Sequence, residues 1–355
     1  MKFLRNLAKH QKFRNPEPFY NNPGFYDNWK KYEVPEKGVC YKYDRFSKQV
    51  VTVMNPQIDT LRFTLDTKDI ALRKSIHEQL ANIGEDWKPD GKEFSEVKFG
   101  KYAKTVCLSG YPSKVYLLAH AVDNTSNRFL QVGIHASSYT ASEISRLFTF
   151  LYELSNRLWT FNYIYKNSKV LRMDWCIDFK HISPLELGMW KVSGTRGANF
   201  FIHKGLGNTG MDIEAKHPNK GNKHKKGKHN ASKAYYYDKQ HQSPLLSEET
   251  TRFEFRTFKE DTSISDNINS GGKKSVFKPY QVLDFATIKP HGFSDHEWLS
   301  FGDTCKLRTI DNAISILPID KQEIAIKTMK SIEERVWRIE ELKKAMEKEA
   351  SRFNL

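Results

Sequence analysis

The sequence has little cysteine and no long apolar run. Its four cysteines are widely scattered and form no CxxC pair, which argues against a disulfide framework or a thiolate zinc site and fits a reducing cytosol. No apolar run approaches the ~18 residues that a membrane-spanning helix needs. The N-terminal segment contains no continuous apolar stretch of the kind found in secretory signals. We therefore expect a cytoplasmic protein that makes no membrane contact.

Several common catalytic motifs are also missing. The chain contains no GxxxxGK[ST] loop, no GxGxxG or GxSxG turn, and no HxH or HExxH histidine pair. The glycine-rich stretch at 205–210 has the wrong spacing for a phosphate loop and is expected to be an ordinary loop. His135 ends a predicted strand, and we expect it to be structural rather than a general base.

Basic residues are abundant, and they are concentrated. The 355 residues carry 57 Lys and Arg against 42 Asp and Glu, a formal net charge of +15. Residues 216–233 contribute seven of these charges without any acid, in a polar context that predicts a loop. Lysines in such a loop would release counterions on meeting DNA or RNA phosphates, although a solvated loop without a partner is the alternative. The lysines concerned are Lys216, Lys220, Lys223, Lys225, Lys226, Lys228 and Lys233.

The apolar periodicity predicts an α+β protein with two similar antiparallel-sheet halves, packed helices and a C-terminal helical tail. Apolar residues make up 39% of the chain and aromatic residues 13%, enough for a sizeable core. We divide the chain into an irregular aromatic arm (1–50), a catalytic body (51–260, with halves at about 57–135 and 140–258) and a mixed segment ending in one long helix (261–355).

Individual elements follow from local patterns. Thr140 and Glu143 form a capping box that begins a helix predicted over 141–165, with Leu158 on its apolar face. The final helix has an apolar face that includes Ile326 and Met346. Around the SGGKK stretch at 270–274 we expect a loop. Strands are predicted at 57–66, 104–109, 114–120, 128–135, 169–179, 198–203, 233–238 and 251–258.

Two of these strands place charged residues opposite an apolar face, because side chains alternate along a strand. Asp174 and Asp178 are about 13 Å apart at the usual strand rise, so they are not expected to bind one cation together. A cation shared between one of them and Glu254 would be Mg²⁺, Mn²⁺ or Ca²⁺ rather than Zn²⁺. The alternative is a wet sheet face with cross-strand ion pairs. The charged residues are Arg172, Asp174, Asp178, Arg252, Glu254 and Arg256.

Three consecutive tyrosines directly follow the basic loop. In an extended segment Tyr235 and Tyr237 share a face with Lys239, whereas Tyr236 faces the core. One of these phenols is a candidate nucleophile on phosphorus, provided that nearby lysines or a bound cation lower its pKa. The alternative is that these tyrosines only pack the sheet surface.

Five segments in a fixed order resemble one family: IDTLRFTLD (58–66), LQVGIHA (130–136), RMDWCID (172–178), YYYDK (235–239) and RFEFR (252–256). Over roughly residues 57–258 the chain resembles the replication initiation factor family, which includes rolling-circle initiators of small plasmids and some filamentous phages, and relaxases of integrative elements. The resemblance implies a divergent two-histidine nickase fold in which acidic residues replace the histidines. It also implies a divalent cation, a nick through a 5′-phosphotyrosine, and a free 3′ hydroxyl that primes synthesis.

The family's motifs fall on particular residues here. Its R-x-D-x-x-x-D strand falls on Arg172, Asp174 and Asp178, and its arginine–aromatic–glutamate strand includes Glu254. The resemblance aligns the nucleophile with Tyr237. Two departures leave the choice among the three tyrosines open, with Tyr237 preferred over Tyr235 and Tyr236 last. Tyr235 itself stands where the family has a basic residue, and Gln242 replaces a glutamate.

We therefore hypothesise a metal-dependent DNA nicking and joining enzyme. Tyr237 attacks the scissile phosphate, Asp174 with Glu254 holds Mg²⁺ or Mn²⁺, and Lys239 helps to ionise the phenol. Arg172 and Arg252 stabilise the developing charge or pair with the carboxylates. A non-catalytic DNA- or RNA-binding protein and a conjugative relaxase are the alternatives.

Possible further partners follow from the same hypothesis. Besides origin DNA, they are a host helicase, a host polymerase and a second copy of the chain. The C-terminal helix either packs on the body or mediates dimerisation or helicase recruitment.

Overall fold

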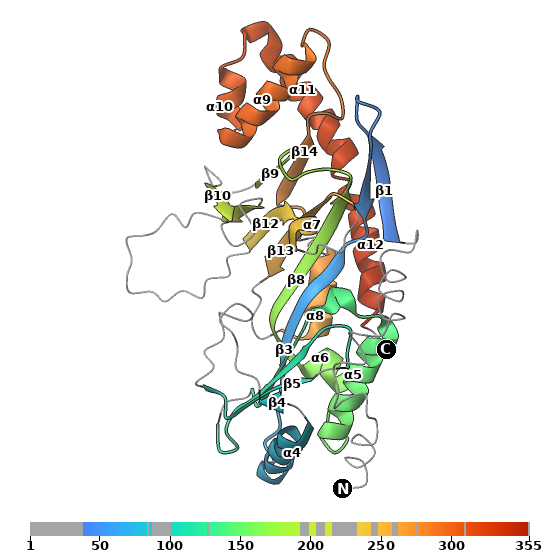
Figure 1. Cartoon of the computed structure of the whole chain (residues 1–355), viewed down its shortest axis with the longest axis vertical. Helices are drawn as coiled ribbons and strands as arrows, with labels where there is room; N and C mark the ends of the chain where they lie inside the picture. The colour runs from blue at the N-terminus through green and yellow to red at the C-terminus, as the bar shows by residue number, and fades with distance from the viewer. Residues whose placement is uncertain are drawn as a thin grey trace, which may run out of the picture.

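The structure is a computed structural model of the chain (Figure 1). It describes residues 38–83, 85–86, 101–108, 110–125, 128–191, 199–203, 210–214, 233–242, 248–257, 262–273, 276–308 and 310–353. The predicted α+β class is confirmed: a large antiparallel sheet carries packed helices and ends in C-terminal helices. Most of the predicted arm (1–37) and Lys216, Lys220, Lys223, Lys225, Lys226 and Lys228 lie outside the described residues.

One sheet contains the strands of both predicted halves. Its strand order is β10-β11-β12-β13-β8-β3-β7-β6-β5-β4, and β2 pairs with β8 and with β1. Strands β3 and β8 join the halves at its centre. The bounds are β1 (Val39–Asp44), β2 (Val50–Met54), β3 (Gln57–Leu65), β4 (Glu85–Asp86), β5 (Lys104–Leu108), β6 (Val115–Ala119), β7 (Leu130–Ile134), β8 (Lys169–Lys180), β10 (Asn199–His203), β11 (Gly210–Glu214), β12 (Lys233–Asp238) and β13 (Thr250–Thr257).

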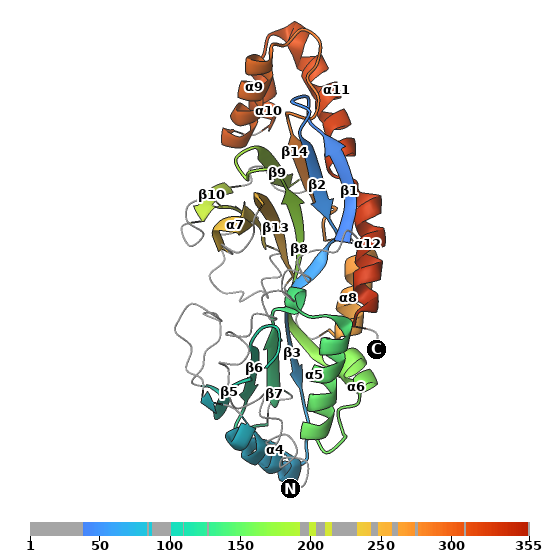
Figure 2. The same ribbon diagram turned by 45° about the vertical axis from the view of Figure 1, so that its right-hand side comes forward.

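Helices cover one face of this sheet, as Figure 2 shows for α5, α6, α8 and α12. At one end of the molecule α9, α10 and α11 lie beside a second, two-stranded sheet. The helices are α4 (Ile70–Ile83), α5 (Ala141–Leu154), α6 (Phe161–Asn167), α7 (Lys239–Gln242), α8 (Ile264–Lys273), α9 (Asp295–Leu307), α10 (Ile310–Ser315), α11 (Ile319–Val336) and α12 (Ile339–Ser351), with a 3₁₀ turn η4 (Ala136–Ser138). The second sheet pairs β9 (Leu187–Lys191) with β14 (Tyr280–Asp284).

The helix predicted over 141–165 is two helices. Its capping box at Thr140 is confirmed, but α5 ends at Leu154, and Asn156 and Arg157 have positive φ angles of 48° and 72°. The break buries Trp159 completely and lets its indole N–H donate to a backbone carbonyl 3.0 Å away. Leu158, predicted on the apolar face, is 46% exposed. Tertiary burial of one tryptophan therefore overrides the local helical pattern.

The long C-terminal helix is also interrupted. Trp337 has non-helical angles (φ −120°, ψ 71°), and its buried ring enters an aromatic cluster of the core. The Tyr41 hydroxyl bridges the break, donating to the Val336 carbonyl (2.8 Å) and accepting from the Arg338 N–H (3.2 Å). Ile326, predicted to be apolar-facing, is 39% exposed. The rings around Trp337 are those of Phe179, Phe253, Phe255 and Phe277.

Three further predictions are wrong. The end of the supposed irregular arm forms the hairpin of β1 and β2, which pairs with the main sheet through β8. Residues 270–273 of the expected SGGKK loop belong to helix α8, and Gly210, expected in a loop, begins strand β11. Strands β9 and β14 were not predicted, because each is completed by a partner that is distant in sequence.

Candidate active site

Three neighbouring strands bring most of the predicted site residues onto one face. Tyr237 of β12 lies opposite Arg252 of β13, which lies opposite Asp178 of β8. One row further, Tyr235 lies opposite Glu254. The next row pairs Arg256 with Asp174. The alternation that predicted a common face for these strands is therefore confirmed.

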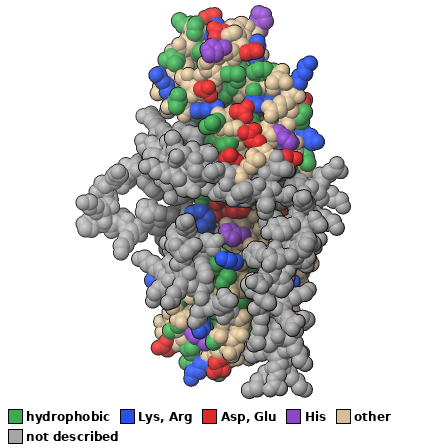
Figure 3. All heavy atoms as spheres, viewed as in Figure 1, with side chains coloured by type: hydrophobic (Ala, Val, Ile, Leu, Met, Phe, Trp, Pro, Cys, Tyr) green, Lys and Arg blue, Asp and Glu red, His purple; other side chains and the backbone are tan. Residues whose placement is uncertain are grey.

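This polar face lies near the middle of the molecule. In Figure 3 acidic, basic and histidine side chains lie side by side there, between the upper helices and the lower part of the sheet. Glu254 is only 7% exposed and Asp174 is fully buried. Carboxylates at this depth must be paired or neutralised, because burial of an isolated charge is costly. The face is therefore more than a solvated sheet surface.

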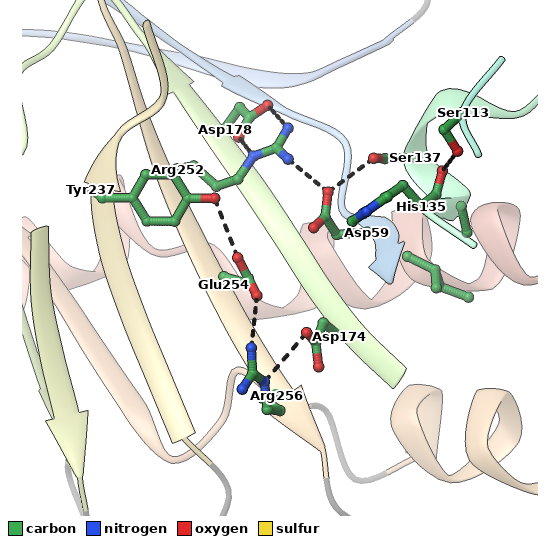
Figure 4. Close-up of polar contacts among 12 residues, drawn as sticks. Asp59, Ser113, His135, Ser137, Asp174, Asp178, Tyr237, Arg252, Glu254 and Arg256 are labelled. Carbon is green, nitrogen blue, oxygen red and sulfur yellow. Dashed lines mark hydrogen bonds and ion pairs between the residues drawn. The ribbon is translucent and has the colours of Figure 1, made fainter. Parts of the chain in front are cut away.

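Asp59 joins this face through a β-bulge. Strict alternation would place Asp59 with Leu61 on the core side, but the register between β3 and β8 shifts between Ile58 and Thr60. The extra residue lets the Asp59 carboxylate turn to the polar face, where it accepts hydrogen bonds from Arg252 (2.7 Å) and Ser137 (2.9 Å; Figure 4). Bulges often re-aim a side chain in this way near active sites. The same irregularity explains why the alternation did not reveal Asp59.

Arg252 connects two of the carboxylates. Its Nε and one terminal nitrogen bind the two oxygens of Asp178, each at 2.7 Å, and its other terminal nitrogen binds Asp59. This bidentate geometry is the strong form of an arginine–carboxylate pair. Burial alone would raise the pKa of Asp59, but the charges of Arg252, Lys239 and His135 outweigh it and hold that pKa below its ordinary value. One guanidinium therefore pairs with both Asp178 and Asp59.

Tyr237 forms a pair with Glu254. The phenol donates a hydrogen bond to Oε2 of Glu254 at 3.2 Å. Burial raises the pKa of Glu254 to about 8, and the neighbouring carboxylates of Asp174 and Asp59 add to the rise. Burial and Glu254 also raise the pKa of Tyr237 well above its ordinary value. Among the described groups, the net effect is therefore to raise the pKa of the Tyr237 phenol, whereas the sequence analysis expected nearby groups to lower it. The group that accepts the hydrogen bond of this phenol is the Glu254 carboxyl.

Two arginines flank the carboxylate pair Asp174 and Glu254. The Arg172 Nε donates to Asp174 at 2.6 Å, and its guanidinium approaches Oε1 of Glu254 at 3.6 Å. Arg256 lies 3.4 Å from Asp174 and 3.8 Å from Glu254 (Figure 4). Its guanidinium also stacks over the Tyr235 ring at 5.3 Å. The result is a compact set of two acids and two permanent cations beside the Tyr237 hydroxyl.

The other predicted site residues lie nearby. Burial, with Glu254 and Asp174, raises the pKa of Tyr235 above its ordinary value. Tyr236 faces the core as predicted, stacked on Phe253. Burial and Arg252 lower the pKa of Lys239, the first residue of α7. Lys233 begins β12 opposite Arg256.

The donor chemistry of Asp174 and Glu254 fits a hard divalent cation. The buried Oδ1 of Asp174 accepts no hydrogen bond from the described part of the chain, and the pKa of Glu254 is raised by burial and by the carboxylates of Asp174 and Asp59. Within those same residues, no group of three or more His, Cys, Asp or Glu is arranged to hold an ion. Two carboxylates suffice for Mg²⁺ only when water and substrate phosphates complete the shell. Asp178 lies apart from this pair, because both its oxygens bind Arg252.

Sequence reasoning did not select Asp59 or Ser137. The ring of His135, which was expected to be structural rather than a general base, lies beside the Asp59 carboxylate (Figure 4). A signal existed for Asp59: it is an acidic residue at an apolar position of a predicted strand. No comparable local signal marks Ser137, which reaches the site from the turn η4.

No helix within the described residues is long and apolar enough to cross a membrane. Comparison with protein-family models finds no match, and no curated protein matches the sequence. Among solved structures, the chain is similar to a rolling circle replication initiator protein from Geobacillus stearothermophilus. That similarity has a TM-score of 0.32 at 14% identity and covers 73% of this chain and 98% of the other.

Proposed function

We propose that the protein nicks and rejoins one strand of DNA through a tyrosine, as a rolling-circle replication initiator does. The observation that carries the proposal is the hydrogen bond from Tyr237 to Glu254 beside a buried, arginine-flanked carboxylate pair. A nucleophile, an adjacent base and groups that stabilise anionic charge are the parts that phosphoryl transfer to a side chain requires.

The chemistry follows from these atoms. The Tyr237 oxygen attacks the scissile phosphorus while its proton passes to Oε2 of Glu254, which accepts it in the ionised form that predominates above its pKa of about 8. The bond from phosphorus to the 3′ oxygen breaks, and that oxygen takes up a proton to become the free 3′ hydroxyl. The phosphotyrosine ester conserves the energy of the original phosphodiester, so that attack by a 3′ hydroxyl reverses the step and rejoins the strand. Tyr235 is the alternative nucleophile.

The arginines have different roles in this proposal. Arg172 and Arg256 lie at the carboxylate pair and would exchange part of their ion pairing for the phosphoryl oxygens as negative charge develops. Arg252 is already engaged through three nitrogens, so its role is to fix Asp178 and Asp59 in place. Lys239, whose charge acts on Asp59, would add positive charge to the site.

Asp174 and Glu254 would hold the Mg²⁺ or Mn²⁺ that the resemblance implies. A bound divalent cation would polarise the phosphoryl oxygens and lower the pKa of the phenol. The buried Oδ1 of Asp174 and the high pKa of Glu254 support this assignment, since a cation satisfies the first and reverses the second.

DNA is the proposed partner, in the cytoplasm of a bacterial host. The segment 216–233 supplies backbone contacts through its lysines, and residues 51–260 form the catalytic body. A host helicase and polymerase would act after the nick, and a second copy of the chain is a further possible partner. The packing of α12 against β1, β3 and α8 supports an internal role for the C-terminal helices.

The test is a covalent adduct on DNA. The protein is incubated with Mn²⁺ and a library of circular single-stranded DNA containing randomised hairpins, and denaturing gels are examined for protein-linked DNA. We expect an adduct whose linear DNA strand has a free 3′ hydroxyl that a polymerase extends, and we expect a chelator to abolish the adduct. Asp174→Asn should reduce its rate at least 100-fold, whereas Asp303→Asn, at an exposed acid of α9, should leave it unchanged. Binding without any adduct would indicate a nucleic-acid-binding protein without this chemistry.

A further inference from the structure

Helix α12, near the C-terminal end of the chain, contacts strand β3, which carries Asp59. Helix α12 packs against β1, β3 and α8, and it lies with α5, α6 and α8 on the helix-covered face of the sheet (Figure 2). Its last turns carry Glu349 and Arg352, which form an ion pair. Both are largely buried, with side chains 12% and 16% exposed. Burial of both charges is costly unless further hydrogen bonds satisfy them, so the other partners of this pair matter.

Glu349 binds the backbone at the β-bulge. Its Oε1 accepts a hydrogen bond from the Ile58 N–H at 3.0 Å, immediately before Asp59. Strand β7 pairs with β3 only from Leu61 onward, so β3 has no β7 partner at Ile58. Glu349 therefore supplies the Ile58 N–H with the hydrogen-bond acceptor that a paired residue of β7 would otherwise provide. The bulge that turns Asp59 toward the polar face is thus held by a side chain almost 300 residues away.

Arg352 binds the second segment that reaches Asp59. One terminal nitrogen donates to the Ala136 carbonyl at 2.8 Å and also to the Tyr139 carbonyl. Ala136 is the first residue of the turn η4, and Tyr139 directly follows the turn. Between them, Ser137 donates a hydrogen bond to the Asp59 carboxylate at 2.9 Å. The other terminal nitrogen pairs with Glu349. One ion pair therefore clamps both segments that fix Asp59.

We propose that Glu349 and Arg352 are positioning residues for the active site: by holding the β3 bulge and the η4 turn, they set the place of Asp59 and hence of Arg252. The inference rests on the proposed function for its catalytic consequence. Arg252 connects Asp59 to Asp178 and is the cross-strand neighbour of Tyr237, so a shift of Asp59 is transmitted to the strand that carries the nucleophile. A misplacement near 1 Å costs a reaction of this type about 100-fold.

The test compares two substitutions of Glu349. Glu349→Gln keeps an oxygen that accepts from Ile58, whereas Glu349→Met has similar size and no comparable acceptor. Glu347→Gln, at an exposed carboxylate two residues earlier, is the matched control. Hydrogen exchange of the Ile58 amide and the Mn²⁺-dependent adduct rate on the DNA library are measured for each full-length variant.

We expect Glu349→Met to accelerate exchange of the Ile58 amide by at least about tenfold. Its adduct rate should fall by at least about tenfold at saturating DNA, with little change in DNA affinity. Glu349→Gln should retain protection within about twofold and recover most of the rate. If Glu349→Met fails to fold, Arg352→Lys replaces it, because one ammonium cannot reproduce the fork that joins Glu349 and two carbonyls.

Unchanged exchange in Glu349→Met would overturn the proposal, as would faster exchange with an unchanged adduct rate. The two proposals fail in distinguishable ways. If the wild-type protein forms no adduct with any DNA in the library, the proposed function is wrong. The exchange rates alone then decide whether the ion pair holds Asp59 in place.

Discussion

At Glu254, burial and the neighbouring carboxylates raise the pKa together. Its pKa of about 8 means that the folded protein holds a proton there that the unfolded chain releases near its ordinary value of 4.5. Because the folded pKa is raised, this residue stabilises the fold fully below pH 4.5, and the contribution is lost as pH rises to about 8. Basic pH should therefore weaken the protein through this one carboxyl group.

We predict that Glu254→Gln removes this dependence. Between about pH 5 and pH 8 the free energy of unfolding of the wild type should fall by about 1.4 kcal/mol per pH unit relative to the variant. Chemical denaturation of both proteins across this range, without divalent cations, measures the difference. Parallel curves for the two proteins would show that Glu254 has an ordinary pKa.

The sequence correctly predicted which face of the sheet a site residue lies on only where the strand is regular. Period-two alternation correctly put Asp174, Glu254 and Tyr237 on one face, because their strands pair without irregularity between β12, β13 and β8. Asp59 was not identified, since its orientation depends on a bulge that only the pairing with β8 creates. The neutralisation of Asp178 by Arg252 was likewise not predictable, because a shared face does not say which charges pair.

At the scale of elements, Trp337 separates two helices that sequence alone joins. Local periodicity continues through Val336 and Ile339, so nothing nearby predicts the interruption. The cause is tertiary: the indole completes the aromatic cluster beneath β8 and β13. Strands and single helices were thus largely predictable, whereas helix breaks depended on contacts with distant residues.

We predict that Trp337→Ala destabilises the protein by about 3–5 kcal/mol, because it leaves a large cavity among four aromatic rings. Ile326→Ala on α11 is the control and should cost about 0.5 kcal/mol or less, since that side chain is 39% exposed. Equilibrium denaturation compares the two. Similar small losses for both would mean that Trp337 does not anchor the C-terminal helices.

At the scale of the whole molecule, two groups of charged residues differ in their balance of positive and negative charge. The polar face pairs its arginines with carboxylates, so it adds little net charge. Seven of the +15 charges come from residues 216–233. The proposed function places affinity for a polyanion in residues 216–233 and chemistry in the polar face, so it predicts that the two respond separately to mutation.

We predict that changing six lysines to glutamine lowers the salt dependence of single-stranded DNA binding without removing the active site. The slope of log K against log salt concentration should become shallower by up to about 4, at about 0.7 per phosphate contact. Glutamine at the exposed Lys330, Lys344 and Lys348 is the control and should leave the slope unchanged. An unchanged slope in the test variant would remove this segment from the interface. The six lysines are Lys216, Lys220, Lys223, Lys225, Lys226 and Lys228.

The most direct measurement is mass spectrometry of the tryptic peptide that carries the nucleotide after reaction with Mn²⁺ and the DNA library. The account predicts a phosphodiester on Tyr237, no adduct from Tyr237→Phe, and an adduct on the same residue from Tyr235→Phe. A nucleotide attached to any other residue, or an undiminished adduct from Tyr237→Phe, would contradict it.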